Sequence, residues 1–166
     1  MLTPDKFKDM MSAVAATTTV VTIPPNGVSD SPSGMTVSAF TSVSADPPVV
    51  LVCVDKRSAS LEAFLATESY TVNFLPQGTG DLAMLFATSG ADKFGDSNHT
   101  PPSSGVGGAV LDQAYGHFEC NVVRSDEVGD HWVIYGEVIA GGRTDPDGEP
   151  LLYVHRGFAR AIPDGA

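Results

Sequence analysis

The part of the chain whose residue types point most directly to ligand chemistry is residues 34–48. This segment is rich in serine and threonine, carries little charge and ends at Pro47-Pro48, directly before an apolar stretch at residues 49–54. Small hydroxyl residues on an extended backbone leave N–H and O–H donors free for a ligand. Such donors can line the polar edge of a planar ring. We therefore predict that residues 34–48 hold a ligand.

Residues 56–60, Lys-Arg-Ser-Ala-Ser, offer a site for an anion. They lie between the apolar stretch and a short helix for which Ser58 is the expected N-cap. Free N–H groups at the start of a helix, hydroxyls and a guanidinium together bind anions such as phosphate. The alternative interpretation is a plain N-cap with a solvated Lys-Arg pair, which the spacing alone favours. Two adjacent cations in so acidic a chain weaken the preference for the plain N-cap over the anion site.

The turn Gly129-Asp130-His131 places a histidine where a strand is expected to begin. An imidazole titrates near neutral pH, so His131 could act on a cofactor or a substrate. A surface turn followed by a half-exposed histidine is the simpler interpretation, and the sequence alone favours it.

Two further candidate sites contain an aromatic residue. Lys93-Phe94 lies in a long loop, where a cation beside an aromatic ring could hold the phosphate and the base of a nucleotide. A loop anchored by one buried phenylalanine explains the pair equally well. Phe158 could stack on the planar ring of a cofactor, although a core aromatic in the last strand is the more frequent arrangement.

The composition excludes several classes of function. The 166 residues carry a formal net charge of −11, which argues against nucleic-acid binding because phosphate contacts need a basic face. A membrane span is not expected, since no run of about 18 apolar residues is present. Lys6 and Lys8 alternate with acids, unlike a signal peptide, so we expect a cytoplasmic location. Cys53 and Cys120 sit in apolar strand patterns and are expected to be buried thiols. The histidines and cysteines lack paired ligand spacing, and no metal site is predicted.

The length predicts one domain over residues 1–166, with a few short helices. A helix should begin at Thr3-Pro4 and present one apolar face. The residues of this face are Phe7, Met10, Met11 and Val14. Further short helices are expected around residues 61–65 and 82–86, and residues 89–108 read as a long loop.

Strands are expected to outnumber these helices. The strand patterns fall at residues 17–23, 35–40, 49–54, 69–75, 116–124, 131–140, 151–154 and 158–162. Asp147-Gly148 is a hairpin signal between two of them. Because the order shows no regular β-α-β alternation, it favours an antiparallel barrel with small helices attached.

Taken in order, these segments resemble the flavin reductase family, the small NAD(P)H:flavin oxidoreductases of two-component monooxygenases. The resemblance runs from Phe7 to about Ala161. Its most specific part is Thr-Val-Ser-Ala-Phe-Thr-Ser-Val-Ser at residues 36–44, followed by Pro47-Pro48. Residues 57–60, 93–94, 129–131 and 150–153 support it through their order along the chain.

The resemblance implies a mainly β fold, the FMN-binding split barrel, which is a Greek-key antiparallel barrel that normally works as a homodimer. It places the flavin ring along the first motif, the flavin phosphate at residues 56–60, and the nicotinamide opposite His131, which would be the catalytic residue. The cofactor-binding residues that it implies are Thr36, Val37, Ser38, Ala39, Ser42, Cys53, Val54, Lys56, Arg57, Ser58, Ser60, Lys93, Phe94, Asp130 and Phe158.

The activity that the resemblance implies is hydride transfer from NADH or NADPH to FMN or FAD, followed by diffusion of reduced flavin to a partner monooxygenase. NADH is preferred over NADPH, because the 2′-phosphate of NADPH needs an extra cation and the chain has only nine basic residues. The alternatives are a flavin-binding protein without reductase activity, a pyridoxamine-phosphate-oxidase-like protein on the same barrel, and a non-catalytic dimeric binding module. Gly129-Asp130-His131 favours the reductase.

Two positions depart from the pattern of the family. The family often has a Thr-Gly pair in its first strand, where this chain has Thr17-Thr18-Thr19. We expect this position to lie away from the chemistry. Phe158 has no hydroxyl where a tyrosine is also common, so a role that needs a phenolic proton is not expected of it.

Overall fold

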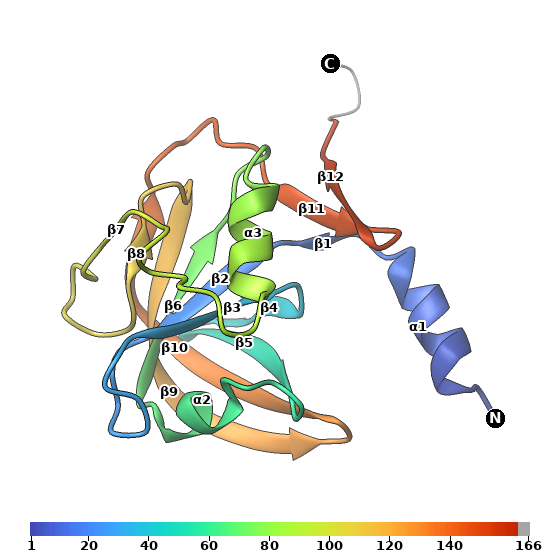
Figure 1. Ribbon diagram of the computed structural model, residues 1–166, viewed down its shortest axis with the longest axis horizontal. Helices are drawn as coiled ribbons and strands as arrows, with labels where there is room; N and C mark the ends of the chain where they lie inside the picture. Colours follow the sequence, from blue (N-terminus) through green and yellow to red (C-terminus); the bar gives the residue numbers. More distant parts are fainter. Residues whose placement is uncertain (163–166) are drawn as a thin grey trace.

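The structure, a computed structural model, describes residues 1–162 and is built mainly of antiparallel strands (Figure 1). The three helices are α1 (Pro4–Ser12), α2 (Leu61–Ala66) and α3 (Gly80–Ala87). The strands are β1 (Ala16–Thr17), β2 (Thr19–Ile23), β3 (Ser33–Val37), β4 (Phe40–Ala45), β5 (Pro48–Asp55), β6 (Ser69–Phe74), β7 (His99–Thr100), β8 (Val110–Leu111), β9 (Gly116–Val128), β10 (His131–Arg143), β11 (Leu151–Val154) and β12 (Gly157–Arg160). The prediction of an antiparallel barrel with few short helices is confirmed.

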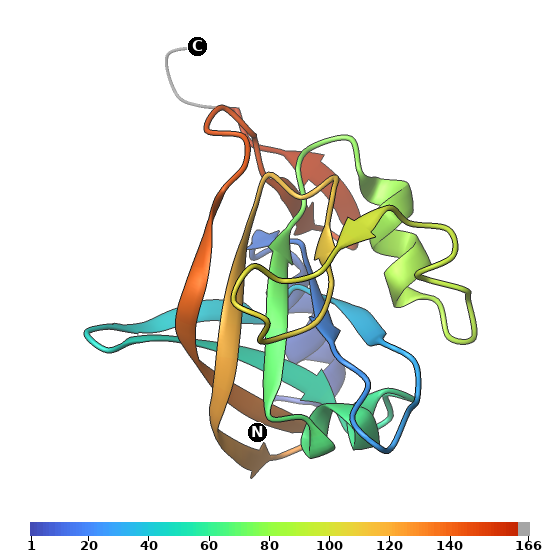
Figure 2. The same ribbon diagram turned by 90° about the vertical axis from the view of Figure 1, so that its left-hand side faces the viewer.

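The main sheet closes into a barrel because its two edge strands are consecutive in the sequence. Its seven strands have the order β3-β2-β6-β9-β10-β5-β4, so β3 and β4 lie at opposite edges. Only Ser38 and Ala39 connect them. A link this short forces the two edges together, and Figure 2 shows the sheet curled around its interior, with the long β9–β10 hairpin forming one wall.

The single strand predicted at residues 35–40 is therefore wrong, because the chain changes pairing partner within it. Val37 pairs with Thr19 of β2, whereas Phe40 pairs with Val52 of β5. Between them the amide of Cys53 donates a hydrogen bond to the carbonyl of Ala39 at 3.0 Å. The break at residues 38–39 allows β3 to pair with β2 and β4 to pair with β5. One continuous strand could not pair with both.

A similar change of partner divides the strand predicted at residues 17–23. β1 pairs with β11 in a second, three-stranded sheet of order β1-β11-β12, and β2 belongs to the barrel. Thr18 lies between them: its N–H donates to the carbonyl of Leu151 at 2.8 Å, and its own carbonyl accepts from Leu75 at 3.4 Å. Thr18 thus links the two sheets.

The hairpin predicted at Asp147-Gly148 is also wrong, although the chain does turn there. The strands on either side, β10 and β11, belong to different sheets. The hairpin near the C-terminal end joins β11 to β12, and its turn residues are His155 and Arg156, with φ of 51° and 61°. Positive φ at both central positions is the geometry that tight hairpins favour, but side chains other than glycine adopt it at a cost.

Two apolar clusters form the core. One fills the barrel and includes Val21, Val52, Phe64, Tyr70 and Ile134. The other packs α3 against the barrel wall and includes Val20, Leu75, Leu82, Phe86 and Leu151. Cys120 is buried and Cys53 half-buried, and both are free thiols, in line with the prediction.

Helix α1 has the predicted start but not a buried apolar face. Thr3 Oγ1 accepts a hydrogen bond from the amide of Lys6, and Pro4 occupies the first turn, as the sequence predicts. No residue of α1 is buried, and the helix stands away from the barrel in Figure 1. The side chains left exposed are those of Phe7, Met10, Met11 and Val14. None of the helices within residues 1–162 is long and apolar enough to cross a membrane.

The loop predicted at residues 89–108 is tied to the barrel by buried polar side chains. Strand β7 lies within this loop and pairs with β8, which follows the end of the loop. Asn73 is fully buried; its amide donates to the carbonyls of Val20 and Ala109, both at 3.2 Å, and its Oδ1 accepts from the amide of Leu111 at 2.8 Å. These bonds satisfy backbone groups of β2 and of residues 109–111, directly beyond the end of the loop.

Glu119 on β9 is the buried carboxylate that anchors the middle of this loop. Its Oε1 accepts from the amide and hydroxyl of Ser103 at 2.7 and 2.9 Å, and its Oε2 from the amide of Ser104 at 2.8 Å. His117 Nε2 lies 3.2 Å from Oε1. Burial raises the pKa of Glu119, but the hydrogen bonds from Ser104 and Ser103 outweigh it and lower the pKa from 4.5 to about 2. The group is therefore ionised at neutral pH.

We expect Glu119→Gln to lower the free energy of unfolding by about 2 kcal/mol at pH 7, because the amide cannot accept the same set of charge-assisted hydrogen bonds. A carboxylate with a depressed folded-state pKa stabilises the fold above its unfolded pKa and loses this effect as the pH falls. The penalty should therefore shrink as the pH falls from 4.5 toward 2. Urea unfolding at several pH values measures it, with Glu62→Gln on the exposed surface of α2 as the control. A penalty independent of pH would contradict this role for the charge.

Candidate functional site

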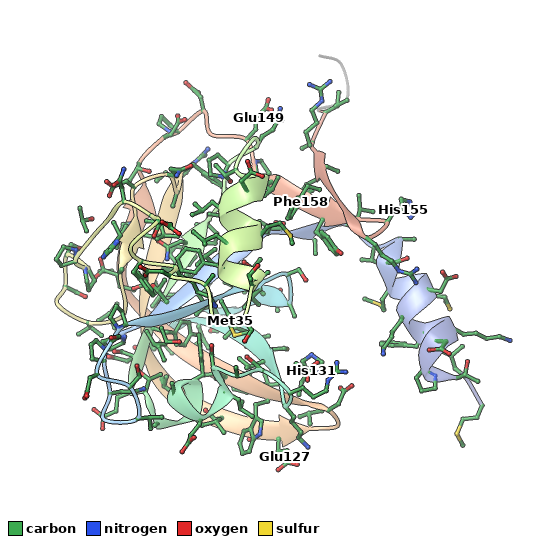
Figure 3. All side chains as sticks on the ribbon, viewed as in Figure 1. Met35, Glu127, His131, Glu149, His155 and Phe158 are labelled. Carbon is green, nitrogen blue, oxygen red and sulfur yellow. The ribbon has the colours of Figure 1, made fainter. Side chains whose placement is uncertain are left out.

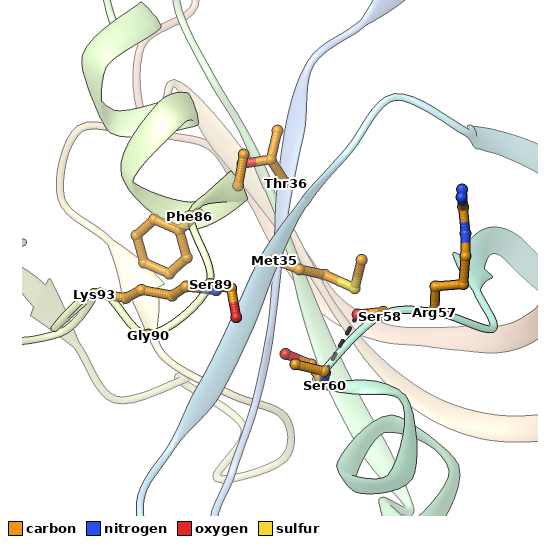
Figure 4. A pocket seen from close by; sticks show the side chains of 11 residues that line it. Met35, Thr36, Arg57, Ser58, Ser60, Phe86, Ser89, Gly90 and Lys93 are labelled. Atoms are coloured by element: carbon orange, nitrogen blue, oxygen red, sulfur yellow. Dashed lines mark hydrogen bonds between the residues drawn. The ribbon is translucent and has the colours of Figure 1, made fainter.

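A first cavity, of about 380 Å³, lies between β3, the turn after β5 and the C-terminal end of α3 (Figure 4). Met35 and Thr36 form its β3 side, and the backbone of this edge strand bonds to β2 on one side only. The other residues that line it are Arg57, Ser58, Ala59, Ser60, Phe86, Ala87, Ser89, Gly90 and Lys93. The structure thus brings together the hydroxyl-rich segment, the predicted anion site and Lys93.

Arg57 is held at the mouth of this cavity by Asp55. Its Nη2 donates to Asp55 Oδ2 at 2.7 Å and its Nε to Oδ1 at 3.1 Å, while its backbone amide donates to Oδ1 at 2.8 Å. These hydrogen bonds hold the pKa of Asp55 well below its ordinary value. Because 82% of the Arg57 side chain is exposed, the guanidinium keeps donors free for a further anion.

The N-cap predicted at Ser58 lies two residues later, at Ser60, and the helix begins at Leu61. The turn formed by Asp55 explains the shift: Asp55 Oδ1 binds the Arg57 amide and its carbonyl accepts from the Ser58 amide at 2.9 Å. Residues 55–58 are thus a closed turn before the helix. Ser58 Oγ accepts from the amide of Ser60 at 3.3 Å, and both hydroxyls line the cavity.

Lys56 does not line this cavity. Its Nζ donates to Glu127 and, at 2.6 Å, to the carbonyl of Gly129, which ties the end of β5 to the tip of the β9–β10 hairpin. Its amide donates to the carbonyl of Asp130 at 3.0 Å. Lys56 therefore positions the turn before His131.

Lys93 lines the first cavity from the side opposite Arg57, as Figure 4 shows. Its Nζ donates to the carbonyl of Gly34 at 2.8 Å and forms no ion pair within the described residues. Partial burial lowers its pKa, because desolvation disfavours the charged amine. Lys93 also lines a neighbouring cavity of about 380 Å³ with Phe94, whose ring packs edge-on against Phe86 at 5.5 Å.

A second, smaller cavity of about 190 Å³ lies beside the first and shares Thr36 and Ala87 with it. Thr36 Oγ1 donates to the carbonyl of Ala83 and so fixes α3 against β3. The second cavity is lined by Thr18, Thr36, Ser38, Ala83, Met84, Ala87, Tyr153 and Phe158. Contrary to expectation, Thr18 is therefore not remote from the hydroxyl-rich segment but lines the same cavity.

A third cavity, of about 490 Å³, shares Ser38 and Tyr153 with the second. It lies between the barrel and α1, and His131 lines it. Figure 3 places His131 at the end of the hairpin wall, on the side that faces α1. Its other lining residues are Phe7, Lys8, Met11, Ser12, Val14, Ala16, Ala39 and Arg156.

His131 is oriented by its neighbour in the chain. Its Nδ1 lies 2.8 Å from Asp130 Oδ1, and this hydrogen bond lowers the pKa of the Asp130 carboxyl. A carboxylate only accepts hydrogen bonds, so Nδ1 carries the proton. That assignment leaves Nε2 available for a ligand. The sequence prediction that Asp130 leads His131 into a site fits this geometry.

Other residues implied by the resemblance lie outside these cavities. Val37 and Val54 are buried in the barrel core, so only their backbone groups are available to a ligand. Cys53 is half-buried on β5, and Ser42 is exposed on β4. Phe158 is the exception, since it lines the second cavity, with its ring edge-on to that of Tyr153 at a centroid distance of 5.8 Å.

Sequence reasoning missed several lining residues, among them Met35, Phe86, Tyr153 and Arg156. Phe86 falls in the apolar spacing of a short helix, which is typical of a buried face. No local pattern around Tyr153 or Arg156 points to a cavity. The placement of Arg156 follows from the turn between β11 and β12 and from Asp9 of α1, whose Oδ1 lies 3.8 Å from Arg156 Nη2.

Comparison with known proteins identifies close relatives of the chain. The family described as "Flavin reductase like domain" matches residues 11–161. A flavin reductase (NADH) of Kitasatospora aureofaciens is 36% identical over 157 residues, which cover 94% of this chain and 81% of that relative. The reductase component of a 4-nitrophenol 4-monooxygenase/4-nitrocatechol 2-monooxygenase of Rhodococcus opacus is 33% identical over 160 residues, or 95% and 81% of the two chains.

A solved structure agrees with these matches. The NADH:FAD oxidoreductase of Streptomyces globisporus, in complex with NAD and FAD fragments, superposes with a TM-score of 0.89 at 31% identity. The superposition covers 100% of this chain and 99% of the other. With the antiparallel topology described above, this likeness confirms the predicted split-barrel fold.

Proposed function

The chain belongs to the flavin reductase family, and from this membership and its three neighbouring cavities we propose that it transfers a hydride from NADH to FMN or FAD. The reduced flavin would then diffuse to a partner monooxygenase. Relatives named as an NADH flavin reductase and as a monooxygenase reductase component support both halves of the proposal. The proposal treats residues 1–166 as one flavin reductase-like domain, and a cytoplasmic location stays a prediction.

The observation that carries the proposal is that three neighbouring cavities share lining residues along residues 36–39. Thr36 is shared by the first and second cavities, and Ser38 by the second and third. Arg57, Ser58 and Ser60 lie at one end of this path and His131 at the other. A flavin nucleotide combines a phosphate with a planar polar ring, and this donor set fits both parts.

When bound, the flavin supplies the redox chemistry by accepting the hydride that NADH releases. Arg57 and the two serine hydroxyls would bind its phosphate. The open backbone edge at residues 36–39 would donate hydrogen bonds to the ring, and such donors stabilise negative charge that develops there. Tyr153 and Phe158 would exclude water from the second cavity. His131 would hold the nicotinamide through Nε2, since Nδ1 is engaged by Asp130.

We expect the purified chain to oxidise NADH only when FMN or FAD is added, as followed by the loss of NADH absorbance. His131→Gln should lower kcat/KM for NADH roughly 10- to 100-fold, because nicotinamide positioning is lost. His155→Asn is the control, since His155 lines none of these cavities and asparagine tolerates positive φ. Flavin binding without NADH oxidation would favour a flavin-binding or pyridoxamine-phosphate-oxidase-like protein instead. Unchanged kinetics in His131→Gln would refute the role of the histidine.

Lys93 supports a further part of the proposal, since its half-buried amine has no carboxylate partner among residues 1–162 and lines the first cavity. We expect Lys93→Met to weaken FMN binding about fivefold to tenfold, while riboflavin, which has no phosphate, binds with unchanged affinity. Quenching of flavin fluorescence measures both dissociation constants. Arg124→Met removes the same charge at an exposed pair with Asp126 and serves as the control. Equal losses for FMN and riboflavin would contradict a phosphate contact.

The proposed assembly is a homodimer, and the exposed face of α1 is the part of the chain that would be covered. Met10 is 64% exposed and Phe7 55%, on a helix with no buried residue. An apolar helical stripe of this kind is typical of an interface. Size-exclusion chromatography with light scattering should give the mass of two chains. Met10→Glu should shift it toward one chain, whereas Lys6→Gln, with the same change in charge, should not. A monomeric unaltered chain would contradict the dimer.

A further inference from the structure

Thr18 is a buried residue whose hydroxyl the fold does not use. Its side chain is 1% exposed, and its backbone links the barrel to the three-stranded sheet. Thr18 Oγ1 has no hydrogen-bond partner, a condition shared within residues 1–162 by only two other buried side-chain atoms, Tyr70 Oη and His117 Nδ1. A buried hydroxyl without a partner destabilises a fold.

Other buried threonines have hydroxyls that do form hydrogen bonds. Thr19 Oγ1 donates to the carbonyl of Val37 at 2.7 Å, Thr22 Oγ1 to that of Ala109 at 2.6 Å, and Thr71 Oγ1 to that of Gly108 at 2.9 Å. Each of these hydroxyls joins two segments of the chain by a hydrogen bond. The Thr18 hydroxyl forms no such bond, although the Thr18 backbone links the two sheets.

Thr18 lines the second cavity, the one between the Arg57 end and the His131 end of the path. The wall around it is mostly apolar and aromatic, formed by Ala83, Met84, Tyr153 and Phe158. With a volume of about 190 Å³, this cavity is below the range of about 300–1,000 Å³ that holds a whole drug-sized ligand. It is therefore suited to part of a ring system whose remainder occupies the adjoining cavities.

We propose that the Thr18 hydroxyl donates a hydrogen bond to a polar edge atom of the flavin ring, and that Thr18 thereby sets the affinity of this chain for the ring. This inference rests on the proposed function. The flavin would supply the hydrogen-bond acceptor that Thr18 Oγ1 lacks within the described residues, and a change of side-chain rotamer about the Cα–Cβ bond would turn Oγ1 toward it. Thr18 acts on the ring alone, because Arg57, Ser58 and Ser60 line the first cavity and not the second.

The proposal predicts that removal of the Thr18 hydroxyl stabilises the free protein and weakens its binding of riboflavin. Thr18→Val keeps the shape of the side chain and removes a hydroxyl that has no partner, so the free protein should melt about 2–4 °C higher. The same change should weaken riboflavin binding about fivefold to tenfold. Thr18→Ser retains the hydroxyl and should bind riboflavin within twofold of the unaltered chain. A purely structural hydroxyl would not produce this combination.

Thermal melting and riboflavin fluorescence titration of the full chain test the proposal, and riboflavin isolates the ring from the phosphate site. Thr22→Val is the matched control: it should melt at a lower temperature, because it loses the bond to Ala109, and should bind riboflavin normally. NAD⁺ affinity, measured by calorimetry, should be unchanged in Thr18→Val.

Unchanged riboflavin affinity in Thr18→Val would overturn the proposal, as would a lower melting temperature for that variant or a loss confined to NAD⁺. If the unaltered chain binds riboflavin and oxidises NADH, such a result leaves the proposed function standing and removes only the role of Thr18. If the unaltered chain binds no flavin, the proposed function fails and this inference fails with it.

Discussion

The link between β3 and β4 constrains the rest of the structure. These strands pair with opposite edges of a seven-stranded sheet, yet only Ser38 and Ala39 separate them. From Val37 to Phe40 the chain can span about 11 Å at most, so the sheet must close wherever its twist and register bring the edges together. Closure leaves unpaired backbone on both edge strands beside the link. The three cavities lie along residues 36–39, beside this link. The hydroxyl groups there are potential hydrogen-bond donors to a ligand.

Buried polar groups then hold the surrounding segments against the closed barrel. Asn73 and Glu119 bind backbone amides of the segment between α3 and β9, which packing alone would leave mobile. The same segment carries Lys93, whose amine reaches the carbonyl of Gly34 on β3. A charge buried at Glu119 is tolerated because three donors from Ser103 and Ser104 surround it.

Much of this arrangement is legible in the sequence, because local patterns determine it. The start of α1, the antiparallel strands and the grouping of Arg57 with Ser58 follow from capping, alternation and adjacency. The breaks at Thr18 and at residues 38–39 do not, since each reflects which distant strand supplies the next partner. The late start of α2 depends on the carboxylate of Asp55, and the failed hairpin at Asp147-Gly148 on a change of sheet. Long-range pairing decides the two breaks and the failed hairpin, and no short window of sequence contains it. The turn at Asp55 is local, but it depends on the hydrogen bonds that this carboxylate makes to Arg57.

Three features of the chain share one property: each is incomplete within a single copy of the folded protein. Thr18 has a hydroxyl without an acceptor, Lys93 a half-buried amine without a carboxylate, and α1 an apolar face without a cover. Each is a local cost that folding alone does not recover. No carboxylate within residues 1–162 pairs with Lys93, although the chain has a net charge of −11. Under the proposed function, the flavin ring, the phosphate and a second subunit would complete these three groups.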